Sequence, residues 1–103
     1  FGVYSTTPPA TAFRHGSPQD EVDALPKREL ASPTDAAGAA TIEAYSIMFS
    51  RDGSPETAQA ACLLADGRRA WGLTSDPAIA AEMCDGEWVG ISCQLDPDGA
   101  LLV

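Results

Sequence analysis

The second half of the chain contains a repeated turn signal: Asp-Gly dipeptides occur at residues 52–53, 66–67, 85–86 and 98–99. Asp-Gly is favoured in tight hairpin turns because glycine, and more weakly aspartate, tolerates a positive φ. Three of these four dipeptides separate segments whose composition is typical of β-strands. This spacing predicts a compact antiparallel β domain.

Five segments are predicted as strands, and they are residues 40–50, 56–65, 68–74, 88–95 and 100–103. The first is rich in Thr, Ile, Tyr, Met and Phe, which favour a pleated, half-buried surface. The second alternates, and its inward face is predicted to carry Ala58, Ala60, Cys62 and Leu64. The third, fourth and fifth segments complete the predicted sheet.

Alternation also separates the two faces of the third and fourth segments. Residues 68–74 place Arg69, Trp71 and Leu73 on one face and the small Ala70 and Gly72 on the other. Residues 88–95 have the clearest period of two, and one face carries Val89, Ile91, Cys93 and Leu95.

One short helix is predicted between the third and fourth strands. Asp76 supplies an N-cap and Pro77 a first-turn proline, and apolar residues then recur at helical spacing up to Gly86. Three strands, a helix and two more strands are the element order of a small antiparallel OB-like β-barrel. The fold class is therefore mainly β, with an irregular six-stranded barrel that uses part of the N-terminal arm as the alternative.

Residues 1–38 are predicted to be an extended, proline-rich arm, and residues 39–103 the barrel. The arm holds five of the eight prolines, and proline removes a backbone donor and fixes φ. Within it, Val22, Leu25 and Leu30 are candidates to touch a surface, with one helical turn before Pro26. We expect this arm to be flexible in isolation and to become ordered against a partner.

The charge of the chain restricts its partners. The net charge is −9, and residues 39–103 carry three arginines against ten acidic residues. Nonspecific nucleic-acid affinity comes largely from Lys and Arg, so we expect no nucleic-acid partner.

The apolar runs are far shorter than about 18 residues, so we expect no membrane span and a soluble, cytoplasmic protein. The chain begins at Phe1 rather than Met, which suggests a processed, excised or partial polypeptide.

The residues that could carry chemistry form no complete constellation. Cys62, Cys84 and Cys93 contain no Cys-x-x-Cys pair and are expected to be buried free thiols. His15 is expected to be an exposed linker residue. We therefore predict no catalytic residue, no cofactor-binding residue and no metal site.

Three further groups have a functional and a structural interpretation. The segment 96–99 resembles part of a calcium loop, but a hairpin turn is favoured. Arg68 and Arg69 could hold an anion, but a solvated strand start is favoured because adjacent strand residues point to opposite faces. Trp71 and Trp88 could stack bases, but packing in a core or interface is favoured.

A family resemblance extends along nearly the whole chain. Residues 2–9 resemble the closing segment of the thiolase domain in type-1 thiolase-like proteins of the acetyl-CoA acetyltransferase group, and residues 21–30 resemble their connecting arm. The segments 40–45, 51–56 and 64–71 resemble the additional C-terminal domain of these proteins.

This resemblance implies a non-catalytic accessory barrel, monomeric and attached to an upstream thiolase-like domain, with a role in docking or in interaction with another protein. The catalytic positions of the family would lie before Phe1, and coenzyme A would belong to the parent protein. Cys84-Asp85-Gly86 matches the Cys-x-Gly of a thiolase active site only superficially, because it lies at a predicted helix end. The alternative is an OB-fold module that binds acyl-CoA or single-stranded nucleic acid.

Overall fold

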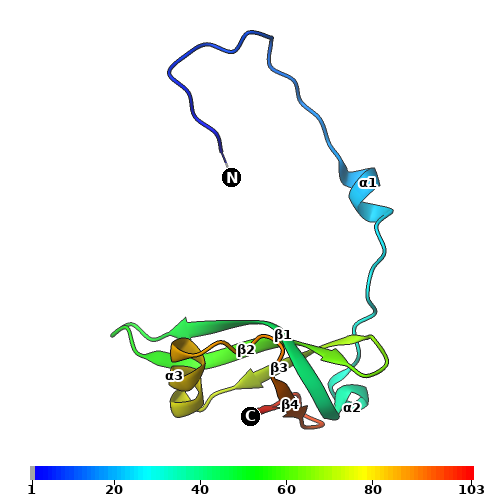
Figure 1. Cartoon of the computed structure of the whole chain (residues 1–103), viewed down its shortest axis with the longest axis vertical. Coiled ribbons are helices and arrows are strands. Elements are labelled where there is room, and N and C mark those ends of the chain that lie inside the picture. The colour runs from blue at the N-terminus through cyan, green and yellow to red at the C-terminus, as the bar shows by residue number, and fades with distance from the viewer. Residues whose placement is uncertain (1) are drawn as a thin grey trace.

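The computed structural model describes residues 2–103 and shows a curled β-sheet with a long N-terminal arm (Figure 1). The strands are β1 (Gly38–Phe49), β2 (Pro55–Leu64), β3 (Arg69–Thr74), β4 (Ser92–Leu95) and β5 (Leu101–Leu102). The helices are α1 (Gln19–Asp23), α2 (Pro33–Ala36) and α3 (Pro77–Asp85). The predicted element order of three strands, a helix and two strands is confirmed.

The sheet has the strand order β3-β2-β1-β4-β5, and all four neighbouring pairs are antiparallel. Its two edges meet at one parallel bridge between Leu73 and Ala100, where the Leu73 N–H donates to the Gly99 carbonyl at 3.0 Å. A five-stranded, partly open barrel with a helix between the third and fourth strands is OB-like. The predicted fold class is therefore confirmed.

Three of the Asp-Gly dipeptides close hairpins with one shared geometry. In the loop 64–68, the Gly67 N–H donates to the Leu64 carbonyl at 3.0 Å, and the Leu64 N–H donates to the Arg68 carbonyl at 2.9 Å. The loops 50–54 and 96–100 have the equivalent pair of bonds. Only glycines have positive φ among residues 2–103, so these are three-residue loops with a left-handed glycine rather than two-residue turns in which aspartate would also need positive φ.

Helix α3 lies against β2 and β1 and closes one side of the core. The Asp76 side chain accepts from the Ala78 N–H at 2.9 Å, which confirms the predicted N-cap. At the other end, Tyr45 Oη donates to the Gly86 carbonyl at 2.8 Å and Trp88 Nε1 donates to the Glu82 carbonyl at 3.2 Å. These two aromatic side chains satisfy carbonyls that the end of a helix leaves without intrahelical partners.

The fourth strand is shorter than predicted, because it begins at Ser92 instead of Trp88. Gly90 has a φ of 85°, and the Ile91 N–H donates to the Trp88 carbonyl at 3.1 Å, so the chain turns before it joins the ladder. Cys93 and Leu95 are buried as predicted, whereas Val89 and Ile91 are exposed. The fifth strand is also shorter, since its ladder contains only Leu101 and Leu102.

The core consists mainly of small side chains. The predicted inward residues of β2 are all buried, and five alanines are buried elsewhere in the cluster. The largest fully buried side chains are those of Ile42, Met83, Leu101 and Cys62. With so many alanines, each larger side chain contributes a large share of the buried apolar surface.

The arm joins the barrel at the free edge of β3. The Ala31 N–H donates to the Arg69 carbonyl at 2.8 Å, and the Arg69 N–H donates to the Glu29 carbonyl at 2.9 Å. This parallel bridge involves Leu30 alone, so the arm does not become a full sixth strand. Ala31 and Ala36 are buried in the core, whereas residues 2–30 are exposed.

Within the exposed part of the arm, α1 is the helical turn expected before Pro26. Val22, Leu25 and Leu30 are all exposed, so in this structure they do not cover an apolar surface. None of the helices in residues 2–103 combines the length and the apolar content that crossing a membrane requires.

Candidate functional site

The two tryptophans lie in different environments. Trp88 is partly buried against the core, as predicted for a packing role, and its ring NH is bonded to the end of α3. Trp71 is 55% exposed and points away from the core of the barrel. Of the two predicted roles, packing in the core applies to Trp88, whereas Trp71 lies outside the core, which leaves packing in an interface for Trp71.

Trp71 is exposed because the inner side of β3 has no room for a large side chain. The inward neighbours of Trp71 are Ala70 and Gly72, and a Cβ on Gly72 would lie 2.7 Å from Leu95 Cδ2. The alternation of a strand then places Trp71 outside. The sequence contained this signal, because small residues on one face of a strand indicate a tightly packed interior.

Trp71 belongs to a continuous surface on the first three strands, which we call the outer face. The register aligns one row across Ala44, Ala61 and Trp71 and a second row across Ser46, Gln59 and Leu73. Met48 continues the face along β1, and Met48 and Leu73 are both about half exposed. The outer face therefore presents apolar and small uncharged side chains to solvent.

Small side chains beside Trp71 leave the outer face hollowed. One hollow of about 290 Å³ is lined by Tyr45 and by every residue of the two rows except Leu73. A second, lined by Trp71, Leu73, Gln59 and Pro33 among others, lies on the side of α2. A third, of about 400 Å³, lies between Trp71 and the side chains of Glu43 and Arg69. Trp71 thus borders three shallow depressions, a shape that can receive side chains of another surface.

An ion pair between Arg69 and Glu43 lies at one end of the outer face. Arg69 Nε lies 2.6 Å from Glu43 Oε2, and this hydrogen bond, supported by the charge of Arg69, holds the pKa of Glu43 below its ordinary value. Glu43 reaches Arg69 because the register of β1 shifts between Ile42 and Ala44. Sequence reasoning missed this partner, since the shift makes Glu43 an extra residue in its strand.

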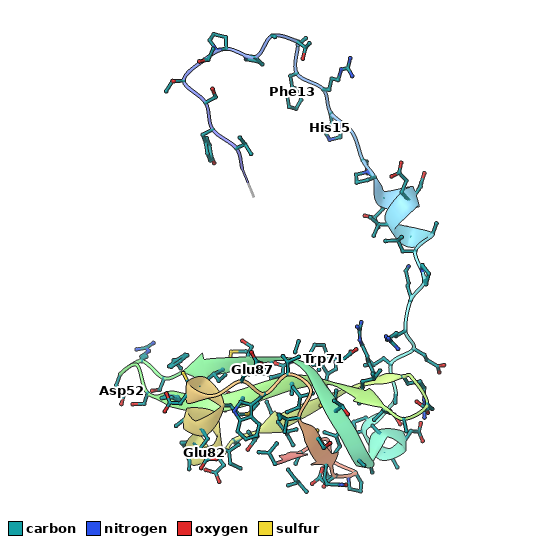
Figure 2. All side chains as sticks on the ribbon, in the orientation of Figure 1. Phe13, His15, Asp52, Trp71, Glu82 and Glu87 are labelled. Carbon is teal, nitrogen blue, oxygen red and sulfur yellow. The ribbon has the colours of Figure 1, made fainter. Side chains whose placement is uncertain are left out.

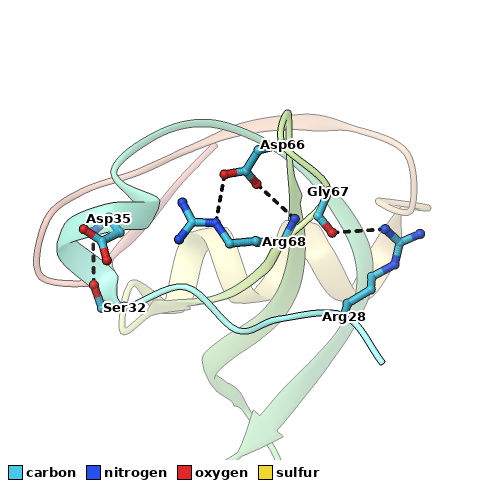
Figure 3. A network of polar contacts seen from close by, with 6 residues as sticks. All are labelled: Arg28, Ser32, Asp35, Asp66, Gly67 and Arg68. Carbon is cyan, nitrogen blue, oxygen red and sulfur yellow. Dashed lines mark hydrogen bonds and ion pairs between the residues drawn. The ribbon is translucent and has the colours of Figure 1, made fainter. Parts of the chain in front are cut away.

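Arg68, which precedes Arg69 in the sequence, also forms an ion pair with a carboxylate (Figure 3). Arg68 Nε lies 2.8 Å from Asp66 Oδ2, and the Arg68 N–H donates to Asp66 Oδ1 at 3.0 Å. These hydrogen bonds lower the pKa of Asp66, and the side-chain bond to Asp66 raises that of Arg68. Beside them, Arg28 of the arm donates to the Gly67 carbonyl at 3.1 Å. The two adjacent arginines therefore hold separate carboxylates and do not form one anion clamp.

The three cysteines fall into two classes. Cys62 and Cys93 are buried with their Sγ atoms 3.8 Å apart, and burial raises the pKa of both thiols, that of Cys62 to about 12. A disulfide needs about 2.05 Å between the sulfurs, so both remain free thiols. Cys84, at the end of α3, is exposed, so the expectation that it is buried is wrong.

Only Cys84 is expected to react rapidly with a disulfide reagent at pH 8. The thiolate is the reactive form, and burial with a raised pKa keeps Cys62 and Cys93 protonated and inaccessible. A colorimetric thiol titration should count one fast thiol in the native chain and all three in guanidinium. Cys84→Ser should abolish the fast phase, and a second fast thiol in the native protein would contradict this assignment.

The loop 50–54 contains a carboxylate with a strongly lowered pKa. Asp52 accepts from Ser50 Oγ and, at 3.0 Å, from the Ser54 N–H, and these hydrogen bonds lower its pKa to about 2. A lowered pKa means that this contribution to stability is complete above the unfolded value of about 3.9 and is lost as the pH falls through about 2. Asp52→Asn should therefore destabilise the hairpin at pH 7 and have little effect near pH 2.

The titration of Asp52 is measurable directly by NMR of its carboxyl carbon, and urea unfolding of the wild type and Asp52→Asn at both pH values gives the stability difference. Equal differences at pH 7 and pH 2 would contradict the role of the ionised carboxylate.

The remaining sequence candidates are a turn segment and an exposed histidine. The segment 96–99 is a hairpin turn, as predicted: Asp96 Oδ1 accepts from the backbone N–H groups of Asp98 and Ala100. His15 is exposed in the arm, as predicted. Among residues 2–103, no three Cys, His, Asp or Glu side chains lie close enough together to hold a metal ion.

Fold and surface together define a small OB-like barrel with an apolar outer face. A family model described as the thiolase-like protein type 1 additional C-terminal domain matches residues 18–100. The chain therefore belongs to this family, and the resemblance described from sequence is confirmed.

A solved structure agrees with this assignment. The crystal structure of a monomeric SCP2-thiolase-like protein type 1 from Mycobacterium smegmatis is similar, with a TM-score of 0.62 and 27% sequence identity. The similarity covers 81% of this chain and 18% of that protein's chain. A comparison with curated proteins finds no match.

Proposed function

We propose that this chain is the non-catalytic accessory domain of a longer thiolase-like polypeptide, and that its barrel docks onto the thiolase domain that precedes the arm. The family match supports this context, as does the solved relative, of which this chain spans about a fifth. The thiolase domain would carry any chemistry on acyl-CoA and any coenzyme A. The unlinked thiols Cys62 and Cys93 fit a reducing compartment such as the cytoplasm.

The main observation in support of this proposal is the attachment of the arm to the edge of β3. Backbone hydrogen bonds of Glu29 and Ala31 to Arg69, together with Arg28 bound to Gly67, fix the end of the arm on the edge of β3. The family match also includes the arm from residue 18 onward. A fixed exit for the arm limits the directions from which an upstream domain reaches the barrel, and a restricted geometry favours docking over free tethering.

Cleavage of the arm tests this proposal. A protease site placed between Gly16 and Ser17, where the chain is exposed, allows the intact polypeptide to be cut after purification. If the barrel is docked, the two fragments should co-elute from a size-exclusion column after cleavage. The uncut polypeptide and the isolated chain serve as elution standards, and separation of the fragments would contradict docking.

A second candidate is a ligand-binding barrel, favoured by the position of Trp71 on strand β3. The face formed by strands 2 and 3 is where OB-folds bind oligonucleotides and sugars. The charges weigh against a polyphosphate ligand, because Arg68 and Arg69 are both engaged by carboxylates and the net charge is −9. Titration of the chain with acetyl-CoA or a single-stranded oligonucleotide at low salt should leave its tryptophan fluorescence, which comes from Trp71 and Trp88, unchanged. A saturable change that Trp71→Phe abolishes would favour this candidate.

A further inference from the structure

The outer face exposes several large apolar side chains on neighbouring strands of the barrel. Trp71 stands 55% exposed beside Leu73 and Met48, each about half exposed. Exposed apolar patches of this kind mark interaction sites, and tryptophan is among the residues most enriched where binding energy is concentrated. We propose that the outer face is the surface by which the barrel docks onto the thiolase domain of the same polypeptide, with Trp71 as the anchor. This inference rests on the proposed function.

The charge distribution favours a protein interface at this face. Residues 39–103 carry three arginines and ten acidic residues, yet the two rows through Trp71 and Leu73 contain no charged side chain. The charges at the end of the face, Arg69 and Glu43, neutralise each other at 2.6 Å. Depletion of charged residues together with enrichment in aromatic residues is the composition of an interface core.

The attachment of the arm indicates that the thiolase domain is the partner that covers the outer face. The arm joins β3 at Arg69, and Trp71 is the next residue along β3 whose side chain lies on the same face. In Figure 2, Trp71 lies on the upper side of the barrel, which is also the side on which the arm lies, and Glu82 of α3 lies on the lower side. More than four-fifths of the relative's chain lies outside the matched part, and this length is enough to form a large domain next to the outer face.

The open shape of the hollows favours protein side chains over a cofactor. The hollows beside Trp71 measure about 290, 300 and 400 Å³ and are open to solvent, whereas small-molecule sites enclose most of the ligand. Apolar side chains of another protein surface can enter them beside Trp71. The anchor residue then contributes most of the energy of the contact.

Substitution of Trp71 in the cleavable polypeptide tests the anchor. Trp71→Glu should weaken retention of the cleaved barrel at least about 30-fold, because it places a charge in an apolar interface. Val89→Glu is the matched control, since Val89 is a similarly exposed apolar residue in the turn before β4. It should leave retention unchanged. Equal retention of wild type and Trp71→Glu would overturn the assignment of Trp71.

A thiol footprint tests the surface without disturbing the anchor. Ser46→Cys places a thiol in the second row of the outer face, and the native Cys84 on α3 is an internal reference in the same molecule. Relative to Cys84, Cys-modifying reagents should label the new thiol about tenfold or more slowly in the intact polypeptide than in the isolated chain. Circular dichroism of each isolated variant confirms that the barrel remains folded.

The combined results separate the two proposals. If the wild-type barrel separates after cleavage, docking itself fails. If it is retained but the thiol at position 46 reacts as fast as in the isolated chain, docking stands and the outer face is the wrong surface. If the isolated chain dimerises at micromolar concentration and Trp71→Glu makes it monomeric, a second copy covers the face and the inference is overturned.

Discussion

Replacing Ile42 with alanine is expected to lower the free energy of unfolding of the barrel by about 2–5 kcal/mol. Ile42 is fully buried in β1, the strand that pairs with both β2 and β4. Its neighbours in the core are mainly alanines, which have no rotamers with which to fill the space that is lost. The cavity therefore persists, and native domains of this size are stable by only about 5–15 kcal/mol.

Urea unfolding followed by circular dichroism measures this loss. Ile42→Val, which removes one methylene group, should cost about 0.5–1.5 kcal/mol and keeps the test informative if the alanine variant does not fold. Met48→Ala on the outer face of the same strand is the control, because its side chain is half exposed, and it should cost less than about 1 kcal/mol. Equal costs for Ile42→Ala and Met48→Ala would mean that the inner and outer faces of β1 are wrongly assigned.

The second large effect is expected from Gly72→Val, which should destabilise the barrel by about 1–3 kcal/mol or more. A Cβ at position 72 would lie 2.7 Å from Leu95 Cδ2 and 3.2 Å from Leu101 Cβ. Real Cβ atoms do not approach so closely, so the buried Leu95 side chain must change its position, or β4 and β5 must move away from β3. A movement of these strands would also strain the bridge at Leu73, through which the two edges of the sheet meet.

Thermal unfolding of Gly72→Val measures this effect, with Leu73→Val as the control on the exposed side of the same strand. The control should remain within about 0.5 kcal/mol of the wild type. If Gly72→Val matched its control, the close approach of β3 to β4 and β5 would be incorrect.

Much of the fold follows from short-range patterns. The alternation in β2 determines which of its side chains are buried, because a strand exposes successive residues on opposite faces. The Asp-Gly loops determine where the strands turn, and Asp76-Pro77 determines where α3 begins. These features depend on residues that are neighbours in sequence, so sequence reasoning reached them.

Features that depend on pairing between distant segments were not reached. The register shift that brings Glu43 to Arg69 arises from the alignment of β1 with β2, and the late start of β4 arises from a turn at Gly90, whose N–H donates to the Ile42 carbonyl of β1. The outer face was missed for a related reason: Trp71, Ala61 and Ala44 become neighbours only once three strands are in register. The acidic composition around Trp71 favoured packing in a core or interface over base stacking, and the packing of Gly72 excludes the core.

Small-angle X-ray scattering of the intact thiolase-like polypeptide tests the central claim most directly. An arm that runs from residue 2 to residue 28 spans up to about 90 Å at roughly 3.3 Å per residue, so an undocked barrel would add tens of ångströms to the particle. Docking predicts a single compact particle with a single-peaked distance distribution. A second peak at long distance, from a barrel that moves freely on its arm, would contradict the account.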